Sequence, residues 1–187
     1  MDEVVIMFED EARFGRINSV RRCRVRGGVR PVVYSQIVKE YTYAYSAICP
    51  FDGTMDSLII PGANSELMSI FLGEVVSRRS DKHVIMLVDQ AGCHTSNILK
   101  VPKNMSLLSL PSHSPQLNPV ENIWHELREK RFYNLTFDSL AEVEDRLMEA
   151  LRAFENDSAS VMKTTAFHWI KAPVYFATWY WKSHRIK

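Results

Sequence analysis

The chain has 187 residues, of which 46% are hydrophobic and 24% charged, and its formal net charge is +1 at pH 7. This composition suits a single soluble globular domain, and the near-neutral charge does not by itself indicate a nucleic-acid partner. The longest apolar runs have the length of a β-strand, which excludes a membrane-spanning helix, so we expect no membrane partner.

Three cysteines, Cys23, Cys49 and Cys93, are too widely spaced to form a C-x-x-C pair. Neither a zinc ribbon nor a disulfide framework is therefore indicated. The N-terminal sequence MDEVV lacks the pattern of a signal peptide. We therefore expect one domain over residues 1–187 that works in a reducing cytoplasm.

The first half of the chain predicts three strands. Val4–Phe8 is apolar and β-branched, as in a buried strand. Tyr41–Cys49 and Thr54–Ile60 predict a hairpin, because Pro50–Gly53 between them ends in an Asp-Gly turn. Residues 11–35 are rich in Arg and Gly and predict irregular structure.

A run of arginines occupies this irregular segment, which contains no acid after Glu11. The segment can be a solvated, mobile basic loop or an arm that contacts DNA phosphates, and composition favours neither. The candidate DNA-binding residues are Arg21, Arg22, Arg24, Arg26 and Arg30.

The second half alternates helices with short apolar strands. A helix begins at Asn64 or Ser65 and runs to about Arg79, with apolar residues three and four apart. Two further strands and two further helices are predicted at His83–Val88, Met105–Leu110, Pro119–Arg131 and Asp138–Phe154. A hairpin followed by helical crossovers predicts an α/β fold, in which helices flank a mixed five-stranded sheet.

Three acids stand at or near the ends of these elements. Asp10 follows the first strand, and period-two alternation puts it on the same face as Ile6 and Phe8. Asp89 directly follows the strand that ends at Val88. Both have an ordinary explanation, because acids are solvated where a strand frays and an Asp at a strand end often only forms a turn.

Glu121, at the start of a predicted helix, has the strongest ordinary explanation of the three. If Asn118 caps the helix and Pro119 is its first residue, Glu121 falls at the third helical position. A Glu there can bond back to the N–H of the cap residue in a capping box, which needs no catalysis.

Taken together, the three acids suit a divalent-metal site. In mixed sheets, ligand and metal sites gather beyond the carboxyl ends of strands. Two hard cations roughly 3.5–4 Å apart can activate the attacking oxygen and stabilise the leaving oxygen of a phosphodiester. Magnesium prefers carboxylate oxygens, so two aspartates and one glutamate meet this need without His or Cys. We therefore expect phosphoryl chemistry on nucleic acid.

Other catalytic motifs are incomplete or absent from the sequence. The segment HELRE at 125–129 lacks the second His of the zinc-protease motif. There is no G-x-S-x-G elbow, Walker A loop or G-x-G-x-x-G loop. Hydrolase, ATP and dinucleotide sites are therefore not indicated.

Three blocks of the sequence resemble a known family. They read FEDEARF at 8–14, LVDQAGCHTS at 87–96 and LPSHSPQLNPVENIW at 110–124. They are similar to the three catalytic blocks of DDE transposases, most of all to the bacterial insertion-sequence-630 family of the mariner-like superfamily. The third block is the most specific, and the resemblance spans about residues 4–155.

The resemblance implies an RNase H-like fold and cut-and-paste movement of a DNA element. The catalytic and metal-binding acids would be Asp10, Asp89 and Glu121, which would hold two Mg²⁺ or Mn²⁺ ions. The supporting neighbours would be His94, Asn118 and Trp124.

The resemblance also implies partners. The DNA partners would be transposon ends and target DNA with TA target sites, and the protein would be a homodimer because two ends must be paired. The helix-turn-helix region of the family has no counterpart in residues 1–187. Recognition of specific ends should therefore be weak or missing in residues 1–187, and a separately encoded DNA-binding half is one candidate partner.

Two other functions stay open. One is a catalytically inactive transposase remnant or DNA-associated regulatory protein, which would keep the fold but not the activity. The other is a different RNase H-like nuclease that acts on RNA–DNA hybrids. The presence of all three acids weighs against the first function, and the Leu-Asn-Pro-Val-Glu block weighs against the second.

Overall fold

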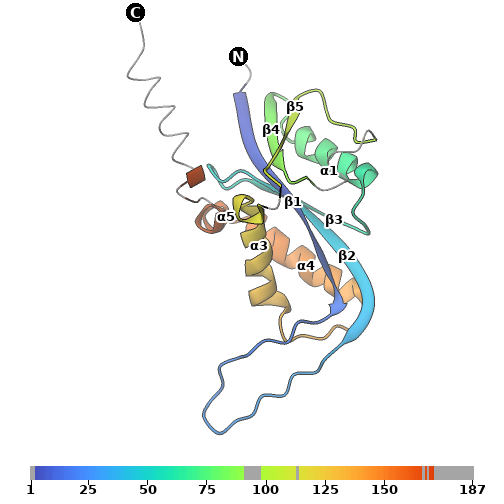
Figure 1. Ribbon diagram of the computed structural model, residues 1–187, viewed down its shortest axis with the longest axis vertical. Coiled ribbons are helices and arrows are strands. Elements are labelled where there is room, and N and C mark those ends of the chain that lie inside the picture. Colours follow the sequence, from blue (N-terminus) through green and yellow to red (C-terminus); the bar gives the residue numbers. More distant parts are fainter. Residues whose placement is uncertain (1–2, 91–97, 113, 166, 168, 171–187) are drawn as a thin grey trace, which may run out of the picture.

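One mixed sheet forms the centre of the protein in the computed structural model, which describes residues 3–90, 98–112, 114–165, 167, 169 and 170 (Figure 1). Its strands are β1 (Glu3–Ile17), β2 (Ile37–Ile48), β3 (Met55–Ile60), β4 (Lys82–Val88) and β5 (Met105–Ser109). Their spatial order is β3-β2-β1-β4-β5. The first three strands pair antiparallel, whereas β1 with β4 and β4 with β5 pair parallel. The prediction of a mixed five-stranded sheet is confirmed.

Helices cover both faces of this sheet. The described helices are α1 (Ser65–Ser77), α3 (Val120–Leu127), α4 (Leu140–Glu155) and α5 (Ser158–Thr165). A 3-10 turn at Pro115–Leu117 precedes α3, and a π-helical turn at Arg128–Phe132 follows it. None of the described helices is long and apolar enough to cross a membrane.

Helix α1 begins where the sequence predicts. The Asn64 side chain accepts hydrogen bonds from the N–H groups of Glu66 and Leu67, which closes the first turn. The helix buries one apolar stripe, namely Met68, Phe71, Leu72 and Val75. These residues pack with Met7, Tyr45 and Met86 of the sheet in one of two hydrophobic cores.

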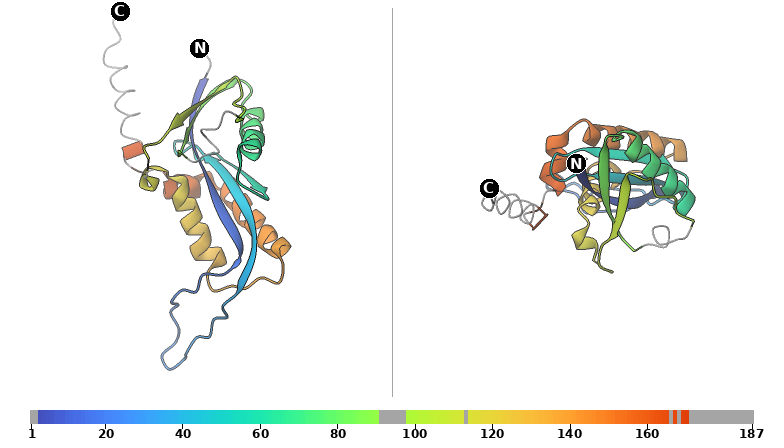
Figure 2. Two further views of the ribbon diagram at one scale, coloured as in Figure 1. Left: turned by 45° about the vertical axis from the view of Figure 1, so that its right-hand side comes forward. Right: turned by 90° about the horizontal axis from the view of Figure 1, so that it is seen from above.

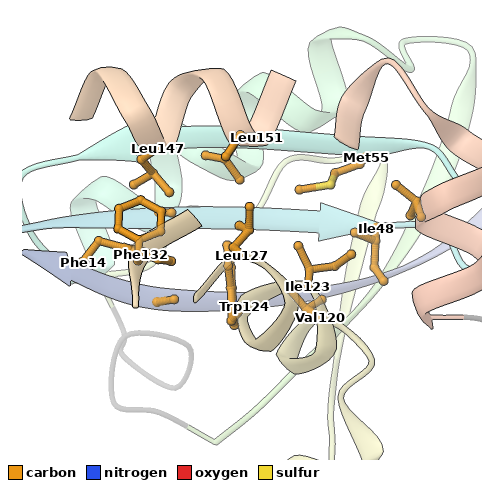
Figure 3. Close-up of a cluster of buried hydrophobic side chains, with 14 of the residues drawn as sticks. Phe14, Ile48, Met55, Val120, Ile123, Trp124, Leu127, Phe132, Leu147 and Leu151 are labelled. Carbon is orange, nitrogen blue, oxygen red and sulfur yellow. The ribbon is translucent and has the colours of Figure 1, made fainter. Parts of the chain in front are cut away.

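The second core lies on the opposite face of the sheet, between β1, β2, α3 and α4 (Figure 3). Val120, Ile123, Trp124 and Leu127 of α3 are almost fully buried there. Burial of a large apolar side chain stabilises a fold by roughly 1.5–3 kcal/mol. This stripe therefore fixes α3, and with it the beginning of α3, against the sheet.

Strand β1 is much longer than predicted. It continues past Phe8 to Ile17 and pairs with β2 over almost that whole length. The prediction of irregular structure over residues 11–35 is therefore wrong for residues 11–17. Alternation explains the extension, because Ala12 and Phe14 point into the same core as Phe8 while charged residues separate them.

The remaining residues between β1 and β2, 18–36, form an arm outside the strands and helices (Figures 1 and 2). Its base is tied together by Asn18 and Gln36. The N–H of Asn18 donates to the carbonyl oxygen of Gln36, and the N–H of Gln36 donates to Asn18 Oδ1 over 2.9 Å. Beyond this base, residues 21–30 are all exposed. Hydrogen bonds therefore hold the base of the arm, and the rest of the arm is exposed to solvent.

Candidate active site

Asp10 lies inside β1 and not at a frayed end. The strand continues to Ile17, and Asp10 pairs with Ser46 of β2. Its side chain lies on the α3 face, where the indole Nε1 of Trp124 donates a hydrogen bond of 2.8 Å to its Oδ2. Asp10 is only 8% exposed. The interpretation of Asp10 as a solvated acid is therefore wrong.

The environment of Asp10 disfavours its charge. The pKa of this carboxyl is raised to about 8, chiefly by burial and further by the negative charges of Glu121, Glu11 and Asp89, while the Trp124 hydrogen bond acts in the opposite direction. A cation beside a buried acid that is surrounded by acids stabilises its anionic form. The electrostatics of the site therefore fit a cation.

Asp89 directly follows β4 at the carboxyl end of that strand. Strands β1 and β4 are parallel neighbours, and Phe8 lies opposite Leu87. Asp10 and Asp89 each lie two residues farther along their strands. The register of the parallel pair therefore brings these two acids to the same level of the sheet.

Glu121 lies in the first turn of α3. The helix begins at Val120, one residue later than predicted, and the Asn118 side chain accepts from the N–H of Val120 over 3.2 Å. The N–H of Asn118 donates to the carbonyl oxygen of Pro115, so it is not available to the Glu121 carboxylate. The capping-box explanation of Glu121 is therefore wrong.

These three acids line one cavity of about 420 Å³. The other lining residues are Gln90, Leu110, Pro111, Ser112, Ser114, Pro115 and Asn118. The structure thus brings together acids that the sequence separates widely. No Lys or Arg is among the described lining residues.

Gln90 and the two serines of the cavity wall were not predicted as site residues. Gln90 Nε2 donates to the carbonyl oxygen of Leu110 over 3.1 Å, and the hydroxyl of Ser112 donates to Gln90 Oε1. These bonds join the segment after β4 to the segment after β5. The position of Gln90 directly after Asp89 was the available signal in the sequence.

The donor set fits divalent cations that are shared between carboxylates. Among the described residues, no three His, Cys, Asp or Glu side chains close around a single point. The acids instead flank the cavity, where they would hold a divalent cation whose coordination water or phosphate oxygens would complete.

The base of the arm contacts the segment that follows α3. The Arg21 N–H donates to Asn134 Oδ1, and the Arg21 guanidinium lies over the Tyr133 ring at 4.7 Å from its centroid. Arg21 therefore helps to hold the arm against the segment that follows α3. The other four candidate residues are exposed, and among the described residues their guanidinium groups have no hydrogen-bond or ion-pair partner: Arg22, Arg24, Arg26 and Arg30.

The supporting residues fall into two groups. Asn118 and Trp124 are buried beside the acids. His94 lies outside the residues that the structure describes.

Residues 5–144 match the DDE superfamily endonuclease family. This chain belongs to that family.

The chain is similar in sequence to a bacterial protein and similar in fold to solved transposase structures. The uncharacterized protein y4pE/y4sA of Sinorhizobium fredii (strain NBRC 101917 / NGR234) is 39% identical over 98 residues, which cover 52% of this chain and 73% of that protein. The Mos1 mariner paired end complex with Mn has a TM-score of 0.60 at 17% identity, over 86% of this chain and 53% of that chain. The Mos1 strand transfer complex has a TM-score of 0.56 at 16% identity, over 84% of this chain and 51% of that chain.

The likeness to Mos1 concerns the fold. This DDE endonuclease domain shares the RNase H-like core of the Mos1 structures, as predicted, and spans about half the length of the Mos1 chains that it matches.

Proposed function

We propose that this chain is the catalytic domain of a cut-and-paste DNA transposase of the bacterial insertion-sequence-630 type. The observation that carries the proposal is the meeting of Asp10, Asp89 and Glu121 in one cavity of a DDE endonuclease domain. Its similarity in fold to transposase structures solved with Mn and with Mg supports the same chemistry.

Each acid has a separate role in the proposed site. Asp10 and Asp89 would hold one divalent cation between β1 and the end of β4, and Glu121 would complete the second cation site from α3. The two Mg²⁺ or Mn²⁺ ions would polarise the attacking oxygen and stabilise the leaving oxygen of a phosphodiester. Water would attack the phosphorus at an element end and break its P–O3′ bond, and the freed 3′-hydroxyl would then attack a phosphorus of target DNA and displace the 3′-oxygen of one target strand.

The polar side chains in the rest of the cavity wall are bonded within the protein. The Ser112 hydroxyl donates to Gln90 Oε1 and the Ser114 hydroxyl to the carbonyl oxygen of Ser112, while the Asn118 amide is directed at the backbone of β1. Because no described lining residue is basic, we assign the affinity for the phosphate backbone to the arm. Arg22, Arg24, Arg26 and Arg30 provide the exposed positive charge there.

The proposed partners follow from cut-and-paste chemistry. Two transposon ends must be cut and joined to one target, so we infer a homodimer that assembles on DNA. Insertion at TA sites is inferred from the resemblance to the insertion-sequence-630 family.

The test is Mn²⁺-dependent nicking of supercoiled plasmid and insertion of a 3′-hydroxyl oligonucleotide into that plasmid. Asp89→Asn removes one carboxylate charge at constant shape, so both activities should fall by at least about 100-fold, or about 2.7 kcal/mol of transition-state stabilisation. The matched control is Asp81→Asn, which changes an exposed Asp in the turn before β4.

The outcomes separate the candidate functions. Equal activity of Asp89→Asn and the wild type would reject the assignment of this acid. Cleavage of RNA–DNA hybrids without oligonucleotide insertion would indicate a different RNase H-like nuclease. A wild-type protein that binds DNA but neither nicks nor inserts would indicate a regulatory remnant.

A further inference from the structure

Two buried side chains connect the beginning of α3 to β1, one on either side of Glu121 in the sequence. Asn118 Nδ2 donates to the carbonyl oxygen of Glu9 over 2.7 Å. Trp124 Nε1 donates to Asp10 Oδ2 over 2.8 Å. Each donor lies three residues from Glu121, and the acceptors belong to consecutive residues of β1. Glu121 is thus held between two anchor points on the strand that carries Asp10.

The apolar contacts of α3 do not by themselves determine this alignment. Val120, Ile123 and Leu127 pack into the core through non-directional contacts, which tolerate small shifts of a helix along or around its axis. Hydrogen bonds are directional and weaken steeply when donor and acceptor are misaligned. Two such bonds at separate points oppose both sliding and rotation of α3 against β1.

Asn118 acts at both elements that it joins. Its Nδ2 donates to β1, while its Oδ1 accepts from the N–H of Val120, the first residue of α3. The same side chain therefore fixes where the helix begins and where that beginning lies relative to β1. Asn118 is only 4% exposed, so water does not compete for these bonds.

Trp124 acts directly on a proposed metal ligand. Its indole N–H binds one oxygen of Asp10, which holds the carboxylate in one orientation at the cavity wall. The ring is 1% exposed and packs edge-on against Phe14. The indole is itself held rigidly, so it can hold the carboxylate in turn.

We propose that Asn118 and Trp124 are positioning residues that set the separation and orientation of the Asp10 and Glu121 carboxylates for cation binding. The inference rests on the proposed function for the identity of the ligand. It also explains the spacing in Asn118-Pro-Val-Glu121-x-x-Trp124, since each of the three polar side chains reaches β1 or the cavity beside it.

The test measures Mn²⁺ affinity by isothermal titration calorimetry on the full chain, without DNA and without turnover. Trp124→Phe keeps an aromatic ring but removes the N–H donor, and Asn118→Ala removes the other anchor. Loss of a side chain that orients a metal ligand typically weakens metal affinity 10–100-fold. Each variant should therefore bind Mn²⁺ at least about 10-fold more weakly than the wild type.

The control is Ile123→Val, which trims a buried residue of the same helix that contacts neither Asp10 nor Glu121 through a hydrogen bond. It should lower the unfolding temperature but leave Mn²⁺ affinity within about twofold of the wild type. If Trp124 and Asn118 affected stability alone, the loss of Mn²⁺ affinity would instead be proportional to the fall in unfolding temperature in all three variants.

The results distinguish this inference from the proposed function. Wild-type affinity in both Trp124→Phe and Asn118→Ala, with the fold retained, would overturn the positioning role and leave the proposed function intact. A wild-type chain that binds no Mn²⁺, either alone or with DNA added, would overturn both. If Trp124→Phe does not fold, Asn118→Ala decides the question on the same criterion.

Discussion

At the scale of single residues, Asp10 has a strongly raised pKa. Its pKa rises from 3.8 to about 8 in the folded protein, chiefly because it is buried. The folded state therefore holds this proton more tightly than the unfolded chain does. The contribution of Asp10 to stability is complete below about pH 4 and is lost as the pH rises to about 8, at about 1.4 kcal/mol for each pKa unit.

We therefore expect the metal-free protein to be several kcal/mol less stable at pH 8 than at pH 5, as measured by urea unfolding. Asp10→Asn should remove most of this difference because an amide does not ionise. Mn²⁺ should restore stability to the wild type at pH 8 but not to Asp10→Asn. If the stability of Asp10→Asn fell equally steeply with pH, titratable groups other than Asp10 would cause most of the pH dependence.

A second residue-scale prediction concerns the ion pair between β3 and the end of α1. Asp56 is 4% exposed and accepts hydrogen bonds from both Arg78 and Arg79. The Arg79 side chain is buried and also donates to the carbonyl oxygen of Val75, whereas the Arg78 side chain is about half exposed. Loss of one partner from a buried pair leaves an uncompensated charge, which costs about 3–5 kcal/mol.

Arg79→Ala should therefore lower the free energy of unfolding by about 3–5 kcal/mol, whereas Arg78→Ala should lower it by less than about 1 kcal/mol. Chemical unfolding of both variants at one pH makes the comparison. Similar losses in the two variants would contradict the unequal roles that their burial indicates.

At the scale of elements, the turn between β2 and β3 also supports the start of α5. Gly53 has a φ of +76°, and a Cβ at this position would lie 2.1 Å from the carbonyl oxygen of Ser158. Gly53→Ala should therefore destabilise the protein by about 2–3 kcal/mol, through backbone strain and the displacement of Ser158. Thermal unfolding measures this loss.

Gly27→Ala is the control for Gly53→Ala. Gly27 lies in the arm, and a Cβ there would have no atom within 4 Å. Its effect should stay within about 0.5 kcal/mol. A large effect of Gly27→Ala would mean that the arm packs more closely than the structure describes.

The elements that the sequence predicted well are those with one unbroken apolar pattern. β4 is a plain apolar run, and α4 has apolar residues at helical spacing that begin after the Ser139 cap. β1 was cut short because charged residues, including the fully buried Glu9, separate its apolar residues beyond Phe8. α5 was missed because it buries few side chains, Val161 and Thr165 among them.

The sequence singled out the three acids that line one cavity, but not how they are arranged there. Three acids near strand ends indicated a metal site, yet the sequence did not distinguish a capping Glu121 from a site residue. That distinction depended on Pro115, whose carbonyl oxygen accepts a hydrogen bond from the N–H of Asn118. The alignment of Asp10 with Asp89 depended on parallel pairing between β1 and β4, which local sequence does not specify.

At the scale of the whole molecule, the acids and the positive charge lie in different places. Among the residues that the structure describes, the cavity wall has three acids and no Lys or Arg, whereas the arm carries exposed arginines beyond its base. Each phosphate contact steepens the dependence of log Kd on log salt by about 0.9. Replacing Arg22, Arg24, Arg26 and Arg30 with Ala should therefore reduce that slope by up to about 3–4 and weaken binding to any DNA sequence.

Fluorescence anisotropy with a labelled duplex at several salt concentrations measures the slope. The control variant replaces Arg152 and Lys163, two exposed basic residues on α4 and α5. Its slope should match that of the wild type. An unchanged slope in the arm variant would show that the arm does not contact phosphates.

The central place of β1 has a consequence for synthesis of the chain. One side of β1 pairs with β2, which follows it, but the other side pairs with β4, which is made only after the arm, the hairpin and α1. Until β4 emerges from the ribosome, β1 presents unpaired N–H and C=O groups next to buried apolar residues. Such an edge promotes association between unfinished chains. A chain that stops before Lys82 should therefore aggregate, whereas one that continues through β4 closes this edge.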